Sequence, residues 1–285
     1  MNPEYQKIVD LFGLAIPQAE QEETDSALAD SPDNLQELAE ASLLQGDYDR
    51  AARHFRKVLE TQPKESLSAR RGLATALECL GQSPQAVRQF SRIIRENGGD
   101  MEASLALGEI YAREGRTSEG LAHLEEAVKL EPENPFPYLK LAEELRRRGY
   151  RERALRAIQG AVLFAPDQSF YHYWMGDILL ELGRFDEALA AFRAAIELSP
   201  GDDYFYIQAS LAFWATGRPL EAIKAVRMAT DLEPDKLWYR VILAEYLHKQ
   251  GQTDEAEIEL KAAKEVGAYE RENLRRLFKL GGLSH

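Results

Sequence analysis

The sequence contains a single cysteine, Cys79, among its 285 residues. One thiol excludes an intrachain disulfide and any zinc or iron–sulfur site built from several cysteines. Long hydrophobic runs are also missing, since no stretch reaches the roughly 20 apolar residues that cross a membrane. The apolar residues 8–16 are interrupted by Asp10 and follow no basic segment, so they do not resemble a signal peptide. We therefore expect a cytoplasmic protein without membrane insertion.

Positive charge is also scarce, because 35 lysines and arginines face 48 aspartates and glutamates, for a formal net charge of -13. Phosphate backbones bind to clustered cations, so we expect no nucleic-acid partner. The five histidines lie far apart in the sequence, without the close spacing of a zinc site. No histidine lies near Cys79 to act as its base, and no phosphate-binding glycine loop is present. The sequence predicts no catalytic site, no metal and no cofactor.

Glycine is abundant and regularly spaced. Each of seven glycines follows the previous one after 35 residues in the first interval and after 34 in the next five: Gly46, Gly81, Gly115, Gly149, Gly183, Gly217 and Gly251. A small residue stands five positions after each glycine, another stands seven before, and a larger apolar residue stands nine after, from Phe55 to Leu260. A fixed period of this length indicates a repeat protein.

Within one period, apolar residues recur at spacings of three and four on both sides of the glycine, which is typical of two helices. The glycine suits the left-handed conformation that ends a helix. Prolines stop the second helix of most blocks, at Pro63, Pro132, Pro166, Pro200 and Pro234. Each block therefore predicts a helical hairpin. The second block ends in residues 97–99 without a proline, one residue is inserted near Ser66, and the last block ends at Gly267.

The chain resembles the tetratricopeptide repeat family, whose period is 34 residues. The residues that carry the resemblance are clearest in one block: Trp174, Met175, Gly176, Leu179, Gly183, Phe185, Ala188, Phe192, Ala195 and Pro200. The resemblance implies an all-α, right-handed superhelical solenoid of seven helix-turn-helix repeats. The repeats occupy residues 32–65, 67–100, 101–134, 135–168, 169–202, 203–236 and 237–270. In such a solenoid the first helices line a concave groove.

The two ends of the chain fit the role of caps, which cover the open core of a solenoid. Residues 271–285 place Leu274, Leu277, Phe278 and Leu280 on one side of a short helix, which predicts a C-terminal cap. Residues 1–31 combine an amphipathic helix, 5–16, with an acidic stretch that is typical of a linker. We expect the first helix to act as an N-terminal cap. The alternative is a tethered helix that binds elsewhere.

Four successive blocks place an aromatic residue at the second position of the first helix, which should face the groove: Phe136, Phe170, Tyr204 and Trp238. Seven residues further on stand Glu109, Glu143, Asp177 and Glu245, with Leu211 breaking the series. Tyr173 and Trp214 add aromatic surface nearby. Such a groove suits an extended or helical segment with apolar and basic side chains. The rings could equally pack between hairpins.

Six arginines lie within eleven positions around the turn of the fourth hairpin, from Arg146 to Arg156. Arg146 and Arg147 should point toward the groove, where they could contact an anion of the partner. The commoner explanation of such a cluster is helix-dipole stabilisation and pairing with acids on neighbouring turns.

These observations favour a protein that binds another protein rather than an enzyme. The predicted function is a protein–protein interaction scaffold or assembly chaperone that binds a peptide or helix of its partner in the groove. One alternative is a self-associating structural protein that forms homo-oligomers through the ends of the solenoid. Another is a regulatory subunit of an enzyme.

Overall fold

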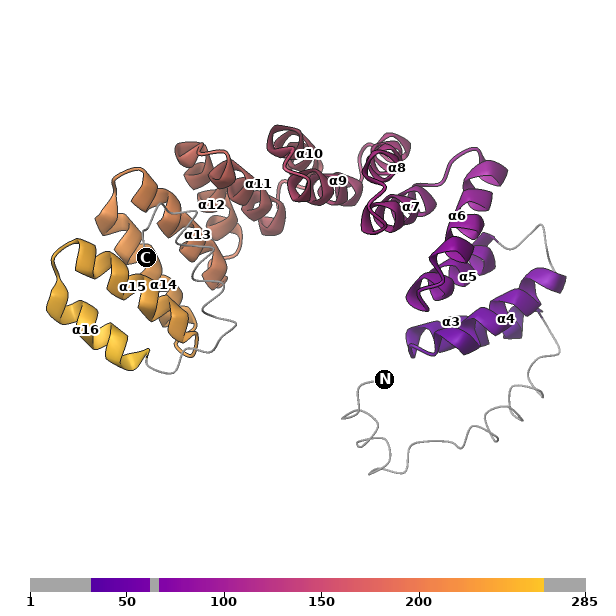
Figure 1. The fold of residues 1–285 in the computed structure, drawn as a ribbon, viewed down its shortest axis with the longest axis horizontal. Helices are drawn as coiled ribbons and strands as arrows, with labels where there is room; N and C mark the ends of the chain where they lie inside the picture. The colour runs from indigo at the N-terminus through magenta and orange to yellow at the C-terminus, as the bar shows by residue number, and fades with distance from the viewer. Residues whose placement is uncertain (1–31, 62–66, 264–285) are drawn as a thin grey trace, which may run out of the picture. The chain divides into compact units, whose positions relative to one another are not determined.

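The computed structural model describes residues 32–61 and 67–263, and every regular element among them is an α-helix. Helices alternate with short turns in the order shown in Figure 1. Their bounds are α3 Pro32–Leu44, α4 Tyr48–Thr61, α5 Leu67–Cys79, α6 Ser83–Asn97, α7 Met101–Arg113, α8 Thr117–Leu130, α9 Pro135–Arg147, α10 Arg151–Phe164, α11 Ser169–Glu181, α12 Phe185–Leu198, α13 Asp203–Ala215, α14 Pro219–Leu232, α15 Leu237–Lys249 and α16 Thr253–Ala262.

Consecutive helices pack as seven antiparallel hairpins, from α3–α4 to α15–α16. The first helix of each hairpin begins at the residue where the corresponding sequence block begins. The prediction of an all-α fold of seven helical hairpins is therefore confirmed. The chain divides into two compact units, residues 1–130 with the first three hairpins and residues 131–285 with the other four. Each unit is described by itself.

The turn of every hairpin contains the periodic glycine in the left-handed conformation. The φ angles of these seven glycines lie between 73° and 81°, where a side chain would clash with the backbone. In the fifth hairpin, Gly183 N–H donates to the Leu180 carbonyl at 3.0 Å and Arg184 N–H donates to the Leu179 carbonyl at 3.0 Å. This pair of bonds satisfies the last carbonyls of the first helix and directs the chain into the second.

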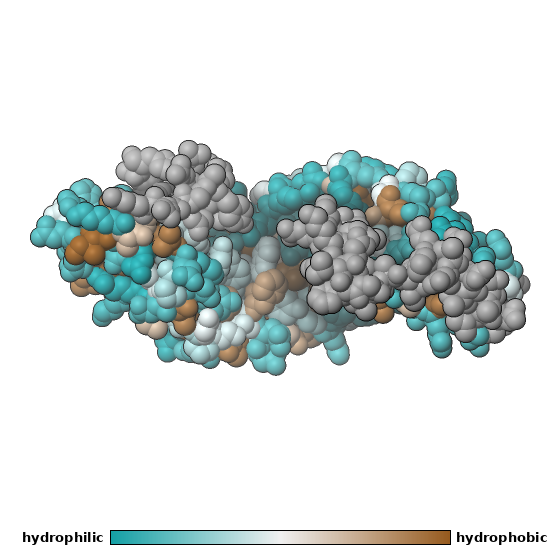
Figure 2. Space-filling model, turned by 90° about the horizontal axis from the view of Figure 1, so that it is seen from below, coloured by the Kyte–Doolittle hydropathy of each residue, from teal (hydrophilic) through white to brown (hydrophobic). Residues whose placement is uncertain are grey.

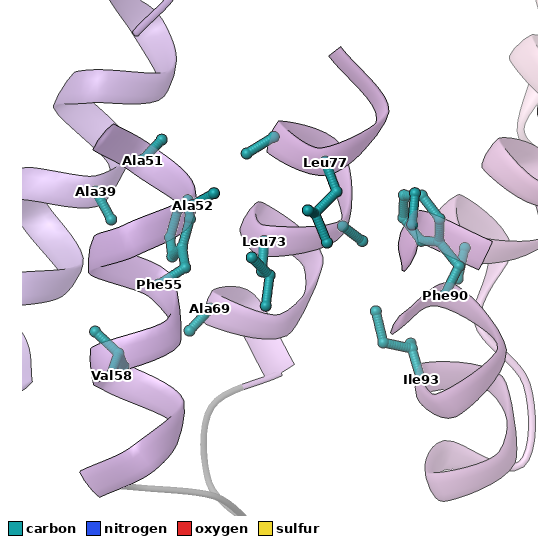
Figure 3. Packing of buried hydrophobic residues seen from close by; sticks show 14 of the residues in the cluster. Ala39, Ala51, Ala52, Phe55, Val58, Ala69, Leu73, Leu77, Phe90 and Ile93 are labelled. Carbon is teal, nitrogen blue, oxygen red and sulfur yellow. The ribbon is translucent and has the colours of Figure 1, made fainter. Parts of the chain in front are cut away.

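The core of the first unit lies between paired helices and is built from apolar side chains of α3 to α7 (Figure 3). Phe55 on α4 is fully buried, and its ring lies so close to Gly72 on α5 that a Cβ atom there would be 2.2 Å from the ring. Phe90 and Ile93 on α6 pack against the same cluster. The small residue at position 72 therefore lets neighbouring hairpins approach closely.

The junction between the second and third hairpins uses glycine in place of the usual proline. Helix α6 ends with Gly98 in the left-handed conformation. Asp100 then caps α7 by accepting a hydrogen bond from Ala103 N–H at 2.8 Å, and it also accepts one from Arg71 on α5 at 2.8 Å. A buried carboxylate thus fixes the start of α7 against the preceding hairpin.

In the second unit, a repeated polar contact joins three of the four hairpins to the end of the preceding block. Tyr138 and Tyr206 donate their hydroxyls to the carbonyls of Pro132 and Pro200, each at 3.0 Å. His172 occupies the same place and its Nε2 lies 2.8 Å from the Pro166 carbonyl. His172 therefore takes the place of a tyrosine in this contact between successive blocks.

The column of larger apolar residues, nine positions after each glycine, is buried in six of the seven hairpins. Leu260 on α16 is the exception and is 50% exposed, because no further described hairpin packs on it. The predicted C-terminal cap at 271–285, the last block's end at Gly267, the inserted residue near Ser66 and the N-terminal segment 1–31 lie outside the described residues. No helix within residues 32–61 and 67–263 has both the length and the apolar character needed to span a membrane.

Candidate protein-binding face on the first helices

Three of the four predicted aromatic residues are exposed at the start of successive first helices. The exposed fractions are 43% for Phe136 on α9, 48% for Phe170 on α11 and 40% for Tyr204 on α13. Helix starts are fixed locally, since the Asn134 side chain accepts a hydrogen bond from Phe136 N–H at 3.0 Å. We call the surface formed by Phe136, Phe170 and Tyr204 the ring face. Their equivalent positions in three successive repeats make this face a candidate binding surface.

Trp238 belongs to the packing between α13 and α15 and not to the ring face, because it is only 4% exposed. Its ring meets Tyr204 edge to face at a centroid distance of 6.1 Å and meets Tyr239 at 4.1 Å. Tyr239 donates a short hydrogen bond to Asp203, and Lys236 Nζ lies 2.7 Å from the same carboxylate. Burial and the adjacent carboxylate raise the pKa of Tyr239. These contacts join the start of α15 to the start of α13.

Tyr173 and Trp214 also pack between hairpins. Tyr173 stacks on Phe205 of the next first helix with centroids 5.4 Å apart, and burial raises its pKa to about 12. Trp214 lies nearly parallel to Tyr246, with an interplanar angle of 5° and centroids 4.3 Å apart. Both side chains are partly exposed, but these contacts assign them to the packing between hairpins.

Each exposed ring, or its aromatic neighbour, has a cation of this chain close to its face. Lys140 Nζ lies 5.5 Å from the centroid of Phe136, and Lys236 Nζ lies 5.5 Å from that of Tyr204. Phe170 contacts Trp174 edge to face at 6.2 Å, and the Arg146 guanidinium lies 5.1 Å from the Trp174 centroid. Phe136, Trp174 and Tyr204 therefore each have one cation–π contact within the chain.

The predicted carboxylates differ in their availability. Asp177 is buried, while Glu143 and Glu245 are partly exposed and form ion pairs at 3.5 Å with Lys140 and Lys249. Glu109 is exposed on α7, in the other compact unit. Within the described part of the second unit, the carboxylates beside the ring face are therefore neutralised by cations of the same surface.

Arg146 forms a buried ion-pair network between α9 and α11. Its guanidinium lies 2.5 Å from Asp177 Oδ2 and 2.7 Å from Glu181 Oε1, and Arg151 Nε lies 3.2 Å from Glu181 Oε2. Burial lowers the pKa of Arg146, but the two carboxylates more than offset this effect and raise it. Burial raises the pKa of Glu181, and its hydrogen bonds to Arg146 and Arg151 reverse this and lower it. Arg146 thus joins two hairpins.

Arg147 lies in a different environment, on the exposed side of α9. Its side chain is 56% exposed and donates from Nε to Glu144 Oε2 at 2.8 Å. Arg148 Nε donates to the other oxygen of Glu144, also at 2.8 Å. Two arginines therefore share one buried carboxylate.

A pocket of about 270 Å³ opens between α9 and α11. It is lined by Glu143, Arg146, Arg147, Trp174 and Glu181. The pocket adjoins the ring face through the contact between Trp174 and Phe170. The residues described by the structure contain no group of three histidine, cysteine or acidic side chains that could hold a metal ion.

Sequence reasoning missed the contribution of Trp174, Lys140 and Lys236. Trp174 and Lys140 stand four residues after an exposed ring, one helical turn along the same face, so this spacing was an available signal. Lys236 lies in the loop before α15, and no periodic pattern indicates its approach to Tyr204. Figure 2 shows a mostly hydrophilic surface on which hydrophobic residues form separate areas.

Comparisons with solved structures support the fold. A tetratricopeptide repeat protein from Parabacteroides merdae aligns over 88% of this chain and 98% of its own, with 15% identity and a TM-score of 0.58. YrrB, described as a TPR protein with an unusual peptide-binding site, aligns over 70% of this chain and 100% of its own, with 22% identity and a TM-score of 0.56. MamA from Desulfovibrio magneticus RS-1, from residue 41 onward, aligns over 58% and 93%, with 22% identity and a TM-score of 0.54.

Among curated proteins, ER membrane protein complex subunit 2 of Xenopus tropicalis is 28% identical over 96 residues. The match covers 34% of this chain, and the chain spans about a third of the length of the curated relatives it matches. Family models described as tetratricopeptide repeat match residues 35–67, 71–135, 169–202 and 207–270, which together are more than half of the sequence. The chain therefore belongs to the tetratricopeptide repeat family.

Proposed function

We propose that the protein is a non-enzymatic interaction scaffold whose ring face binds a segment of another protein. The observation that carries this proposal is the regular exposure of Phe136, Phe170 and Tyr204 on three successive first helices. Burying such rings against a partner is favourable by roughly 25 cal/mol for each Å² of apolar area. The peptide-binding site of YrrB, a protein of the same fold, is in keeping with this role.

The proposed partner segment is apolar and can be extended or helical. The sequence alone favoured basic side chains in the partner, because carboxylates accompany the rings. The cations beside Phe136, Trp174 and Tyr204 change this proposal, since a partner cation above these rings would meet like charge. The ring face therefore selects for apolar side chains and not for lysine or arginine.

The test is a selection of phage-displayed random peptides on the immobilised protein. Wild type should enrich apolar sequences, and Phe136→Ala with Phe170→Ala should enrich none of them. A matched control is Leu163→Ala with Leu220→Ala, which removes two exposed apolar side chains from α10 and α14. Equal enrichment by both double variants would show that the ring face is not the binding surface.

Self-association is a second candidate, favoured by the end of the last hairpin. A groove of about 390 Å³ between α15 and α16 is lined by both apolar and polar residues, and Val241 and Leu260 are among the apolar ones. In the preceding hairpins the residues equivalent to Leu260 are covered by the next first helix, so a helix of a second copy would fit there. Light scattering over a range of concentrations tests this candidate, and a constant monomeric mass at the highest concentration would eliminate it.

A further inference from the structure

Glu144 on α9 is a buried carboxylate that two arginines contact. Its side chain is 7% exposed, and its two oxygens accept hydrogen bonds from Arg147 and from Arg148. Two guanidinium groups therefore share this one carboxylate.

Arg147 is the arginine of this pair that can leave. Its side chain is 56% exposed, compared with 28% for that of Arg148, so it loses less packing when it turns toward solvent. Glu144 would then keep its 2.8 Å hydrogen bond to Arg148, and no buried charge would be left unpaired. That condition matters because an unpaired buried carboxylate is strongly unfavourable.

Arg147 borders the pocket between α9 and α11, where the other charges are already matched. Arg146 is held by Asp177 and Glu181, so it has no charge to offer a ligand. The indole of Trp174 forms an apolar part of the lining and leads to Phe170 on the ring face. An acidic group placed here would meet Arg147 while its apolar neighbours reach the rings.

The same lining limits the charge of the ligand. Glu143 and Glu181 also border the pocket, and both would repel a group with two negative charges more than one with a single charge. A carboxylate carries one charge and matches the planar fork of a guanidinium. A phosphate carries nearly two charges at neutral pH, so the pocket favours a carboxylate.

We propose that this pocket binds a carboxylate of the partner segment through Arg147, next to the apolar side chains that occupy the ring face. The proposal rests on the proposed function and specifies the partner: an apolar segment that carries an acidic group at a fixed distance from its anchors. A basic segment is the opposite of this expectation.

The experiment repeats the phage selection with single-charge variants. Wild type should enrich peptides with aspartate or glutamate at a constant spacing from the apolar residues. Arg147→Gln should enrich apolar peptides without that acidic position. Arg193→Gln is the matched control, because it removes the same charge from the exposed side of α12, and it should keep the wild-type pattern.

Arg148→Gln gives a second, independent readout. Without Arg148, Arg147 becomes the main partner of Glu144 and is less able to leave it. The acidic preference should therefore weaken in this variant although Arg147 is intact. An unchanged acidic preference in either Arg147→Gln or Arg148→Gln would overturn the proposed role of Arg147, and so would a basic consensus in wild type.

Synthetic peptides made from the selected sequence identify the source of the carboxylate. A side-chain carboxylate predicts that replacing the acidic residue by glutamine weakens binding to wild type about tenfold, as expected for one charge-assisted hydrogen-bonded pair. If the carboxylate is instead the free C-terminus of the partner, a peptide that ends at the acidic position should bind more weakly when its C-terminus is amidated. Tighter binding of a phosphoserine peptide than of the glutamate peptide would contradict the preference for a single charge.

These outcomes separate the two proposals. If Phe136→Ala with Phe170→Ala abolishes selection but Arg147→Gln leaves the acidic position unchanged, the ring face stands and the carboxylate pocket fails. The proposed function fails if wild type enriches no peptide family, or if Phe136→Ala with Phe170→Ala enriches the same peptides as wild type. The proposal for the carboxylate pocket then fails as well.

Discussion

The guanidinium of Arg146 on α9 lies 2.5 Å from the carboxylate of Asp177 on α11. The two side chains are 12% and 4% exposed, so this ion pair is buried between the first helices of neighbouring hairpins. Both residues were candidates for partner binding on sequence grounds, and their mutual contact instead gives them a role in holding the hairpins together. The side chain of the neighbouring Arg147, by contrast, is 56% exposed.

Asp177→Ala should destabilise the second unit, because it leaves Arg146 buried with only Glu181 as its partner. Breaking a buried ion pair from one side costs about 3 kcal/mol. Thermal unfolding followed by circular dichroism measures the loss. Glu143→Ala is the matched control, since its ion pair with Lys140 is partly exposed and should contribute little. Equal melting temperatures for Asp177→Ala and wild type would contradict the structural role of the pair.

Acid should weaken the same network through Glu181. The pKa of Glu181 is lowered from its ordinary value of 4.5 in the folded protein, so its contribution to stability is complete above that value and is lost as the pH falls through the folded pKa. Glu181→Gln has no carboxylate to protonate. Melting temperatures measured from neutral pH down to pH about 3 should therefore fall less steeply for Glu181→Gln than for wild type. Parallel curves would exclude Glu181 as a source of the acid sensitivity.

Gly120→Ala should destabilise the third hairpin, where α7 and α8 approach most closely. A Cβ atom at Gly120 would lie 2.9 Å from the Gly108 carbonyl oxygen and 3.0 Å from Ala112 N. Backbone atoms cannot move aside cheaply, so overpacking should cost about 1–3 kcal/mol, more than the helix-propensity gain of alanine. Gly201→Ala is the control, because nothing lies within 4 Å of its Cβ position. Calorimetry should show a lower melting temperature for Gly120→Ala alone.

Trp214→Ala should lower stability, whereas Phe170→Ala should not. Trp214 stacks on the buried Tyr246, and removing a packed indole costs on the order of 2 kcal/mol or more. Phe170 is nearly half exposed, and substitutions at such positions are close to neutral. Urea denaturation of the two variants separates packing rings from binding rings. A large loss of stability in Phe170→Ala would show that Phe170 is part of the core.

The repeat, its phase and its turns could be predicted from the sequence because each depends on local constraints. Gly183 must be a glycine for its positive φ angle, and Pro200 must follow a helix end, whatever surrounds them. Phe192 is buried in a position that recurs in every block. These features repeat, so each block provides evidence for the others.

The site was less predictable because exposure depends on what the next hairpin contributes. Trp238 shares its position in the repeat with Phe170, yet it is buried and contacts the rings of Tyr204 and Tyr239. The orientation of the Arg146 side chain likewise depends on its ion pairs with Asp177 and Glu181, one hairpin further along the chain. Such pairings join residues more than thirty positions apart, and no single block reveals them.

The most direct test of the ring face is titration calorimetry with one selected peptide and two double variants. If the ring face binds the peptide, Leu163→Ala with Leu220→Ala should bind it as tightly as wild type. Phe136→Ala with Phe170→Ala should show no measurable heat at the same concentrations. Circular dichroism must show the same helical content in all three proteins. Equal affinity of both variants for the peptide would show that the ring face is not the binding surface.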